Sequence, residues 1–507
     1  MKGGALVSGK KPSQTIVIDW KPDKQSKIPL YSQIVSYFSE KVASGDWVSG
    51  QIIPSQRNLS ELFGVNRSTI VEAMDELSAL GIIESGFGRG TRIANDSWSL
   101  LMRDKAPDWQ DYIRGGSFHS NVPTVQIINR MEFEPGIIRM STGELSPDLM
   151  QTEITSEVLK RLSTQNVFMN YPDQMGMPGL RSALQEHLRR IGIDVPLSCI
   201  LIVSGALQAL QLISTGIVKA KATVYVEEPS YLASMNIFQS VGAVLKGIPM
   251  DSNGISYWMI QEQKIVPQHS LLYTIPTFQN PTGGVMPMSR RVELLNYCRN
   301  AHIPIIEDDV LRDLWLEEEP PLPIKSLDQN GVVVYTGSLS KCFSPGLRLG
   351  WLVGPESVVR RLADVKMQMD YGVSVLTQQV GEELFRSGLY YEAVDETRQK
   401  LRERRDWMLQ LLERYFSDLA DWDKPAGGFF IWVRLRNRAS AEQLFSRALK
   451  ERLLILPGSV YDNMGCSSAI RLTYGYLSAG EMERGVRRLS ELLREMERAQ
   501  HGIYPQK

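Results

Sequence analysis

From about residue 131 to its end, this chain alternates short apolar segments with helix-length stretches, and several apolar segments lead directly into polar residues. One of them, Val332–Tyr335, is followed by Ser338, Ser340 and Lys341. This alternation of strand-like and helical segments is typical of an α/β fold with a mainly parallel sheet. In such sheets ligands bind at the carboxyl ends of the strands, so the pattern predicts a binding site at that edge.

Four further apolar segments have the same design. Each precedes, within a few residues, a side chain or a helix-opening glycine that can contact a ligand: Ile303–Ile306 precedes Asp308, Leu271–Ile275 precedes Asn280, Val224–Val226 precedes Tyr231, and Ile200–Val203 precedes Gly205, Ala206 and Leu207. Because parallel strands end at one edge of a sheet, we expect these residues to lie together.

Lys341 has the most distinctive chemistry of the set. A lysine amine can form a Schiff base with an aldehyde, while Ser338, Ser340 and Arg348 can bind a phosphate group. Pyridoxal 5'-phosphate carries both an aldehyde and a phosphate and needs partners for each. The sequence therefore predicts a site for this cofactor with Lys341 as its covalent anchor.

The charge and shape of the other side chains suggest their roles around the cofactor ring. Asp308 can keep the pyridine nitrogen protonated, Asn280 can hydrogen-bond the phenolic oxygen, and Tyr231 can stack on the ring. Arg471, late in the chain, is suited to bind the carboxylate of an amino acid.

The phosphate end of the site is predicted from a glycine that opens a helix. Gly205, Ala206 and Leu207 stand where the segment after a strand turns into a helix, so backbone amides there can face the phosphate.

Residues 28–95 have a different pattern, which predicts three helices and a hairpin. The signals are helical spacing of apolar residues from Tyr31 to Val42, a second helix opened by Pro54–Ser55 and ended by Gly64, a third helix capped by Asn66, and strand-like segments on either side of Gly86–Gly90. Three helices with such a hairpin describe a winged helix-turn-helix.

The third helix of this unit begins with residues suited to DNA. Arg67 can bind guanine in a bidentate manner, and Ser68 and Thr69 suit base or phosphate contacts. Arg57, one helix earlier, is placed for the DNA backbone, and Arg89 at the hairpin tip for a minor groove.

Two ordered sets of residues resemble known families. The strings Pro54–Arg57, Gly64–Thr69, Leu77–Gly81 and Gly88–Thr91 resemble the GntR-type winged helix. That resemblance implies DNA contacts at Arg57, Asn66, Arg67, Ser68, Thr69, Gly88 and Arg89.

The second half of the chain resembles the fold type I aminotransferases. The resemblance is carried by Tyr171–Gly176, Asn280–Gly283, Glu307–Asp309 and Ser338–Lys341 in this order. Two places depart from the usual pattern. Val310 and Leu311 stand where a tyrosine commonly follows the ring aspartate, and Ala206 and Leu207 replace polar residues of the phosphate turn.

Together the two halves resemble the MocR subfamily of GntR regulators. The resemblance implies a fold with a mainly α winged helix-turn-helix and an α/β, pyridoxal-phosphate-dependent, aminotransferase-like domain. It also implies a head-to-tail homodimer that binds a double-stranded operator. We expect a loose tail over residues 1–27, the DNA-binding domain over 28–95, a linker over 96–130 and the large domain over 131–507.

Composition limits the other options. The 507 residues are too many for a single core, and a net charge of −1 means that DNA contacts must come from a local patch. The four cysteines are scattered without a Cys-x-x-Cys pair, so we expect no disulfide framework and no metal site, in keeping with a reducing cytoplasm. No apolar run reaches membrane-spanning length.

These inferences predict a transcriptional regulator rather than an efficient enzyme. We expect an amino compound to displace Lys341 and form an external aldimine, with its carboxylate on Arg471. Two alternatives stay open: a regulator that responds to the pyridoxal phosphate level alone, and an active aminotransferase with an accessory DNA-binding module.

Overall fold

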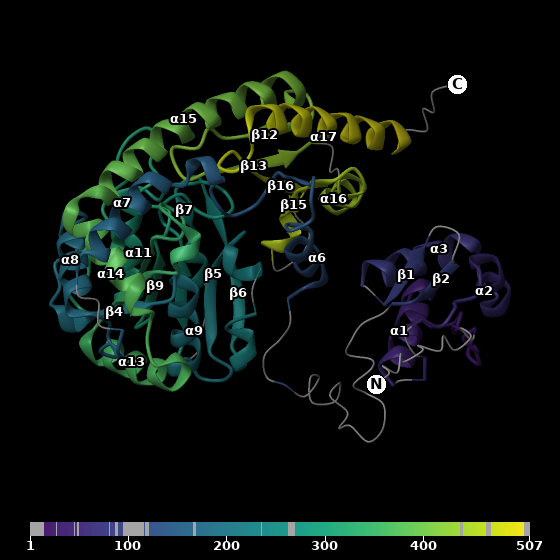
Figure 1. Cartoon of the computed structure of the whole chain (residues 1–507), viewed down its shortest axis with the longest axis horizontal. Helices are drawn as coiled ribbons and strands as arrows, with labels where there is room; N and C mark the ends of the chain where they lie inside the picture. Colours follow the sequence, from purple (N-terminus) through teal and green to yellow (C-terminus); the bar gives the residue numbers. More distant parts are fainter. Residues whose placement is uncertain are drawn as a thin grey trace, which may run out of the picture. The chain divides into compact units, whose positions relative to one another are not determined.

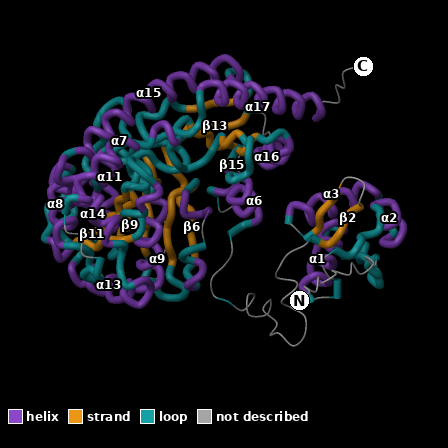
Figure 2. Tube along the Cα trace, in the orientation of Figure 1, coloured by secondary structure: helices purple, strands orange, loops and turns teal. Residues whose placement is uncertain are grey.

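The computed structural model divides the chain into two compact units, Met1–Gly116 and Ser117–Lys507. The residues that it describes are 15–26, 28–44, 46–47, 50–80, 82–86, 90–94, 116, 121–165, 169–234, 236–261, 269–436, 440–462 and 468–500. Figure 1 shows the course of the chain, and Figure 2 its helices and strands.

The N-terminal unit has the predicted three helices and hairpin. Its elements are α1 (Leu30–Ala43), α2 (Gln56–Phe63), α3 (Arg67–Ala79), β1 (Ile83–Gly86) and β2 (Gly90–Ile93), the last two paired antiparallel. Their apolar faces meet in one core that contains Phe38, Leu59, Phe63, Ile70 and Leu77. The predicted winged-helix fold is thus confirmed.

Local signals explain the turn between α2 and α3. The Ser55 hydroxyl accepts a hydrogen bond from the backbone N–H of Asn58 and so caps α2. Gly64 ends α2 in the left-handed region at φ +65°, where glycine is favoured. Asn66 occupies the N-cap position of α3, but its side chain makes no capping hydrogen bond.

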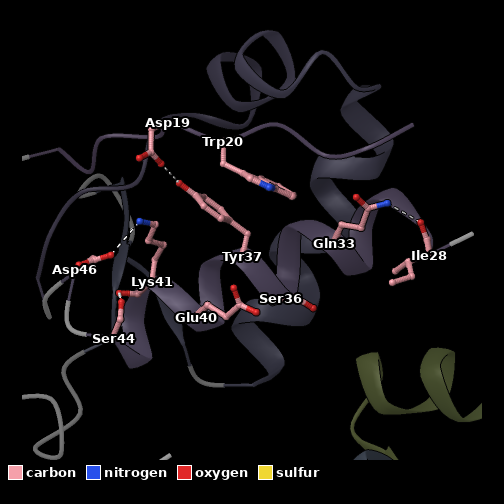
Figure 3. A pocket seen from close by; sticks show the side chains of 10 residues that line it. All are labelled: Asp19, Trp20, Ile28, Gln33, Ser36, Tyr37, Glu40, Lys41, Ser44 and Asp46. Atoms are coloured by element: carbon pink, nitrogen blue, oxygen red, sulfur yellow. Dashed lines mark hydrogen bonds and ion pairs between the residues drawn. The ribbon is translucent and has the colours of Figure 1, made fainter. Parts of the chain in front are cut away.

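Residues 15–26, part of the stretch expected to be a loose tail, pack against this unit instead. The backbone N–H of Ile16 donates to the carbonyl of Ile52 at 3.0 Å, and Ile16 joins the core. The Trp20 ring stacks on Tyr37 of α1 with centroids 4.5 Å apart, and the Tyr37 hydroxyl donates to Asp19 at 2.8 Å (Figure 3). Burial of Ile16 and Trp20 explains why this segment is ordered.

An eight-stranded sheet forms the centre of the large unit. In spatial order its strands are β4 (Ile200–Val203), β11 (Gly350–Val353), β10 (Val333–Ser338), β9 (Ile305–Asp308), β8 (Leu271–Thr274), β5 (Thr223–Glu228), β6 (Val244–Asp251) and β7 (Gly254–Ile255). The run from β10 to β6 is parallel, whereas β11 is antiparallel to both of its neighbours. Every residue of β4, β8, β9, β10 and β11 is buried, as expected for strands covered on both faces.

Helices surround this sheet (Figure 2). They are α7 (Thr152–Ser163), α8 (Pro178–Arg190), α9 (Ala206–Gly216), α10 (Trp258–Gln261), α11 (Met288–Asn300), α12 (Ile324–Leu327), α13 (Glu356–Asp370) and α14 (Val375–Ser387). The α/β architecture predicted from the alternating segments is confirmed.

A smaller antiparallel sheet lies beside the long C-terminal helices (Figure 1). Its strands are β12 (Ala420–Trp422), β13 (Phe430–Leu435), β16 (Ala469–Thr473) and β15 (Leu456–Pro457). The helices of this region are α15 (Leu389–Phe416), α16 (Ala441–Lys450) and α17 (Ala479–Gln500), and the short strands β14 (Leu453–Leu454) and β3 (Ile138–Arg139) pair in parallel. Arg471 on strand β16 lines the same cavity as Asp308 and Ser338, which end two strands of the large sheet.

The end of the expected linker is also structured. Helix α6 (Pro123–Met131) begins with proline at a favourable first position and buries Ile128 against the large unit. Apolar residues at helical spacing, Val125 and Ile128, account for this difference from the expectation for residues 96–130. Among the described residues, no helix has the length and apolar content needed to span a bilayer.

Candidate cofactor site and DNA-contact surface

One cavity of about 490 Å³ collects most of the residues predicted for the cofactor. Strands β9 and β10 are parallel neighbours that end at Asp308 and Ser338, and both residues line the cavity. The other predicted residues in its lining are Ala206, Leu207, Tyr231, Asn280, Ser340, Lys341, Arg348 and Arg471. The carboxyl edge of the sheet therefore brings together side chains that are far apart in sequence.

Lys341 is half-buried in this cavity and has no carboxylate partner among the described residues. Its Nζ donates to the backbone carbonyl of Gly143 at 2.5 Å. Burial, followed by the nearby Arg471, lowers the pKa of Lys341 to about 8. Two lysines in the described part of the chain are more deeply buried, and each pairs with a carboxylate: Lys325 with Asp328 at 2.9 Å and Lys366 with Asp370 at 2.7 Å. The lowered pKa of Lys341 makes its neutral, nucleophilic form more accessible near neutral pH.

Asp308 presents one oxygen that lacks a partner. Its Oδ2 accepts a hydrogen bond from the Tyr273 hydroxyl at 2.8 Å, while Oδ1 is buried with no partner among the described residues. Burial raises the pKa of Asp308 to about 6, and the Tyr273 hydrogen bond opposes that rise. A buried, half-satisfied carboxylate is favourably completed by a cation such as a protonated pyridine nitrogen.

Hydroxyl groups and a guanidinium cluster near the start of α9. Ser338 and Ser340 share a hydrogen bond of 3.0 Å between their hydroxyls, and Arg348 Nη1 lies 3.4 Å from the Ser340 hydroxyl. Gly205 precedes α9 at φ +82°, and a Cβ there would lie 2.8 Å from Arg348 Nη2. Only glycine allows this close approach, which places Arg348 beside the amides that open α9, a suitable environment for a phosphate.

Arg471 is a buried cation with an unused donor. Its Nη1 donates to Asn280 Oδ1 at 2.8 Å and its Nη2 to the Ser141 carbonyl at 2.6 Å, but Nε has no partner among the described residues. The Phe430 and Tyr461 ring centroids lie 3.9 and 5.3 Å from its Cζ. Burial lowers the pKa of Arg471, and no carboxylate among the described residues forms an ion pair with it. An anionic group of a ligand fits here.

Sequence reasoning missed two parts of the site. Tyr273 lies on β8, which is the parallel neighbour of β9, so the strand pairing itself points Tyr273 toward Asp308. Val125 and Ile128 on α6, which line the cavity, fell within the expected linker over residues 96–130, and Glu132 lies directly after the helix. The helical spacing of Val125 and Ile128 was the available signal.

The residues predicted for DNA lie at the surface of the N-terminal unit. Arg57, Asn66, Arg67 and Ser68 are exposed, and Thr69 is half-buried at the start of α3. Arg57 forms an exposed ion pair with Glu61 at 3.4 Å, which DNA phosphates can replace. Gly88 and Arg89 lie outside the described residues.

Both halves of the chain match family models. Residues 30–93 match the bacterial regulatory proteins of the gntR family, and residues 135–489 match aminotransferase class I and II. The chain belongs to the MocR-type GntR regulators. The HTH-type transcriptional regulator YisV of Bacillus subtilis is 44% identical over 477 residues, covering 94% of this regulator and 98% of YisV. The regulator NorG of Staphylococcus aureus is 33% identical over 430 residues, covering 84% and 96% of the two chains.

Solved structures similar to this regulator include aminotransferases. A kynurenine aminotransferase of Pyrococcus horikoshii, in complex with PMP, is 29% identical with a TM-score of 0.70, covering 78% of this chain and 98% of that chain. The α-aminoadipate aminotransferase LysN of Thermus thermophilus, complexed with N-(5'-phosphopyridoxyl)-L-leucine, is 29% identical with a TM-score of 0.69, covering 77% and 99%.

The donor set of the cavity fits pyridoxal 5'-phosphate. The orphaned Asp308 Oδ1 suits the ring nitrogen, Lys341 the aldehyde, and Ser338, Ser340 and Arg348 the phosphate.

Proposed function

We propose that this transcriptional regulator senses an amino compound at Lys341 and changes its affinity for operator DNA in response. Pyridoxal 5'-phosphate is the cofactor implied by the family and by the residues of the site. When bound, it supplies an aldehyde carbon that amines attack reversibly. The proposed DNA-contact surface consists of Arg57, Asn66, Arg67, Ser68, Thr69, Gly88 and Arg89.

The observation that carries the proposal is that an amine and an unsatisfied guanidinium line the same cavity. Lys341 is half-buried with a lowered pKa, and Arg471 lines the same cavity with an Nε that has no hydrogen-bond partner among the described residues. An amino acid satisfies both positions, with its amino group toward Lys341 and its carboxylate on Arg471.

The exchange at Lys341 needs no oxidant or reductant. Lys341 would hold the cofactor at its aldehyde carbon, and the cofactor would supply there a carbon at which an amino group of the effector can take the place of the lysine amine. Lys341 would take up the two protons that the incoming amine gives up. A pKa of about 8 keeps both the protonated and the neutral form of the Lys341 amine accessible near neutral pH, as a reversible exchange requires.

Effector binding must favour one of two arrangements of the protein if it is to change DNA affinity. A ligand shifts such an equilibrium only through contacts that differ between the two states. We propose that these states belong to a head-to-tail homodimer in the cytoplasm, in which the bond at Lys341 and the contact at Arg471 provide the difference.

The apolar residues beside Asp308 favour a sensor over an efficient aminotransferase. Val310 and Leu311 line the cavity where a hydroxyl near the reacting centre would promote proton transfer. The solved relatives are aminotransferases, so residual turnover is the second candidate function. A third is a response to the cofactor level alone.

A DNA-binding titration with the full-length protein separates these functions. Operator affinity is measured by fluorescence anisotropy with cofactor alone, and then with cofactor plus a panel of amino acids. The proposal predicts a change on addition of an amino acid to the wild-type protein and none with Lys341→Ala. A full response to cofactor without an amino acid, or an unaltered amino acid response in Lys341→Ala, would contradict it. Steady release of a keto acid would instead indicate an aminotransferase.

A further inference from the structure

One face of helix α6 forms a wall of the effector cavity. The cavity is lined by Val125, Ile128 and Asn129 of this helix and by Glu132, which follows its last residue. Most of these residues are three or four positions apart. This spacing puts them on one side of a helix or on its last turn. The site of the effector is therefore bounded by the segment that directly follows the connection to the DNA-binding unit in sequence.

Glu132 is the unusual residue of this wall. Its carboxylate makes no hydrogen bond or ion pair with any described residue, although it lines a cavity that contains buried cations. Nearby cations have other partners. Arg139 pairs with Glu144 at 3.2 Å and lies over the Tyr476 ring, and Arg471 is held by Asn280.

The charge of Glu132 acts inside the cavity. Burial is the main cause of the raised pKa of Tyr461, and Glu132 adds to that rise. Burial also lowers the pKa of Arg471, which Glu132 partly opposes. The Glu132 carboxylate is thus within electrostatic reach of the position proposed for the carboxylate of the effector.

Apolar side chains line the same cavity as these two charges. Val125 and Ile128 come from α6, and Leu456 and Val460 from the region of the small sheet. Such a surface suits a chain of methylene groups, and a charged group at its end requires an opposite charge.

We propose that the effector is an α-amino acid with a cationic side chain, whose carboxylate binds Arg471, whose aliphatic stem packs on Val125 and Ile128, and whose terminal ammonium pairs with Glu132. This inference rests on the proposed function and specifies its ligand class. Such a ligand bridges Arg471 on β16 and Glu132 at the end of α6. It therefore holds in place the start of the large unit, which follows the connection to the DNA-binding unit in sequence. Ligands that reach only Arg471 leave α6 without this contact.

The test compares amino acids that differ by one ammonium group. L-Lysine and L-norleucine share a four-carbon side chain, as L-ornithine and L-norvaline share a three-carbon one, and only the first of each pair has a terminal amine. The visible absorbance of the cofactor-loaded, full-length protein is followed as each compound is added. We expect at least one cationic amino acid to bind about tenfold or more tightly than its uncharged counterpart, as a partly buried charge pair allows.

The variant Glu132→Gln keeps the size of the side chain and removes its charge. It should abolish the preference for the cationic member of each pair. Glu134→Gln is the matched control, because Glu134 is exposed two residues later and does not line the cavity. It should retain the preference.

Equal binding within both pairs in the wild-type protein would overturn the inference, as would a preference that survives Glu132→Gln. Either result leaves the proposed function standing, provided that amino acids still change the spectrum. A spectrum that no amino compound alters would instead contradict the proposed function itself.

Discussion

The DNA-contact surface and the cofactor cavity use charged residues in opposite environments. On the N-terminal unit, Arg57 and Arg67 are exposed, and the ion pair of Arg57 with Glu61 has side chains that are 85% and 69% accessible. In the large unit, Asp308, Lys341 and Arg471 are buried or nearly so, and the pKa of each is displaced mainly by burial.

This difference predicts how each region responds to substitution. Water screens exposed charges, so each DNA contact contributes a modest and graded amount. Burial strengthens each interaction in the cavity and makes an unpaired group costly, so single changes there have large effects. The predictions below test this contrast, beginning with the largest effect.

Replacing Asp308 by asparagine should weaken cofactor binding by at least about a hundredfold, because a buried charge opposite the ring nitrogen is lost. The dissociation constant is measured by adding the cofactor to apo-protein and following absorbance. Tyr273→Phe sharpens the test. It removes one hydrogen bond to Asp308 but keeps the carboxylate, and should cost about tenfold or less. Unchanged affinity in Asp308→Asn would place the ring elsewhere.

Ile16→Ala should lower the stability of the N-terminal unit by about 2 kcal/mol, because Ile16 is buried in its core. The neighbouring Val17 is 79% exposed, so Val17→Ala is a matched control that should have little effect. Differential scanning calorimetry follows the transition of this unit. Equal shifts in both variants would show that the segment is not held as described. Cofactor affinity should be the same in both.

The pH dependence of cofactor capture reports on Lys341. Its lowered pKa makes the neutral amine available at a lower pH than in an ordinary lysine, so the capture rate should rise roughly tenfold from pH 7 to pH 9 and then level off. Stopped-flow absorbance measures this rate. Arg471→Gln removes a nearby positive charge and should move the midpoint upward. A rate that keeps rising beyond pH 10 would indicate an ordinary, exposed lysine.

Arg67→Ala should reduce operator affinity about fivefold, with sequence preference relaxed at the contacted base pair. Arg57→Ala should act similarly on all sequences and reduce the salt dependence of binding by about one phosphate contact. Anisotropy titrations at several salt concentrations measure both effects. The cofactor spectrum should not change. Complete loss of binding in Arg57→Ala alone would contradict the graded behaviour expected of exposed contacts.

Local sequence signals predicted the main elements of both regions. Strands that end at Asp308 and Ser338 could be placed at one sheet edge because the polar residues follow apolar segments directly. The winged helix followed from caps and turns such as Ser55 and Gly64. In both cases the signal was local, and the structure has the predicted elements.

The parts that were not predicted depend on contacts between distant segments. Nothing near Trp20 in sequence indicates that its ring stacks on Tyr37, so the sequence alone predicts a tail over residues 1–27, which includes the packed segment 15–26. Helix α6 is short, and its role depends on a cavity assembled from β9, β10 and β16. The partner of Asp308, Tyr273, becomes evident only when the order of the strands is known.

We propose that Lys341 binds the cofactor covalently in the cavity and exchanges it with an amino compound. Borohydride reduction of the cofactor-loaded protein, followed by mass spectrometry of its peptides, measures this bond. We expect a pyridoxyl group on the peptide that contains Lys341, and its loss when a saturating amino acid is added before reduction. An unmodified Lys341, or a pyridoxyl group on a different lysine, would contradict it.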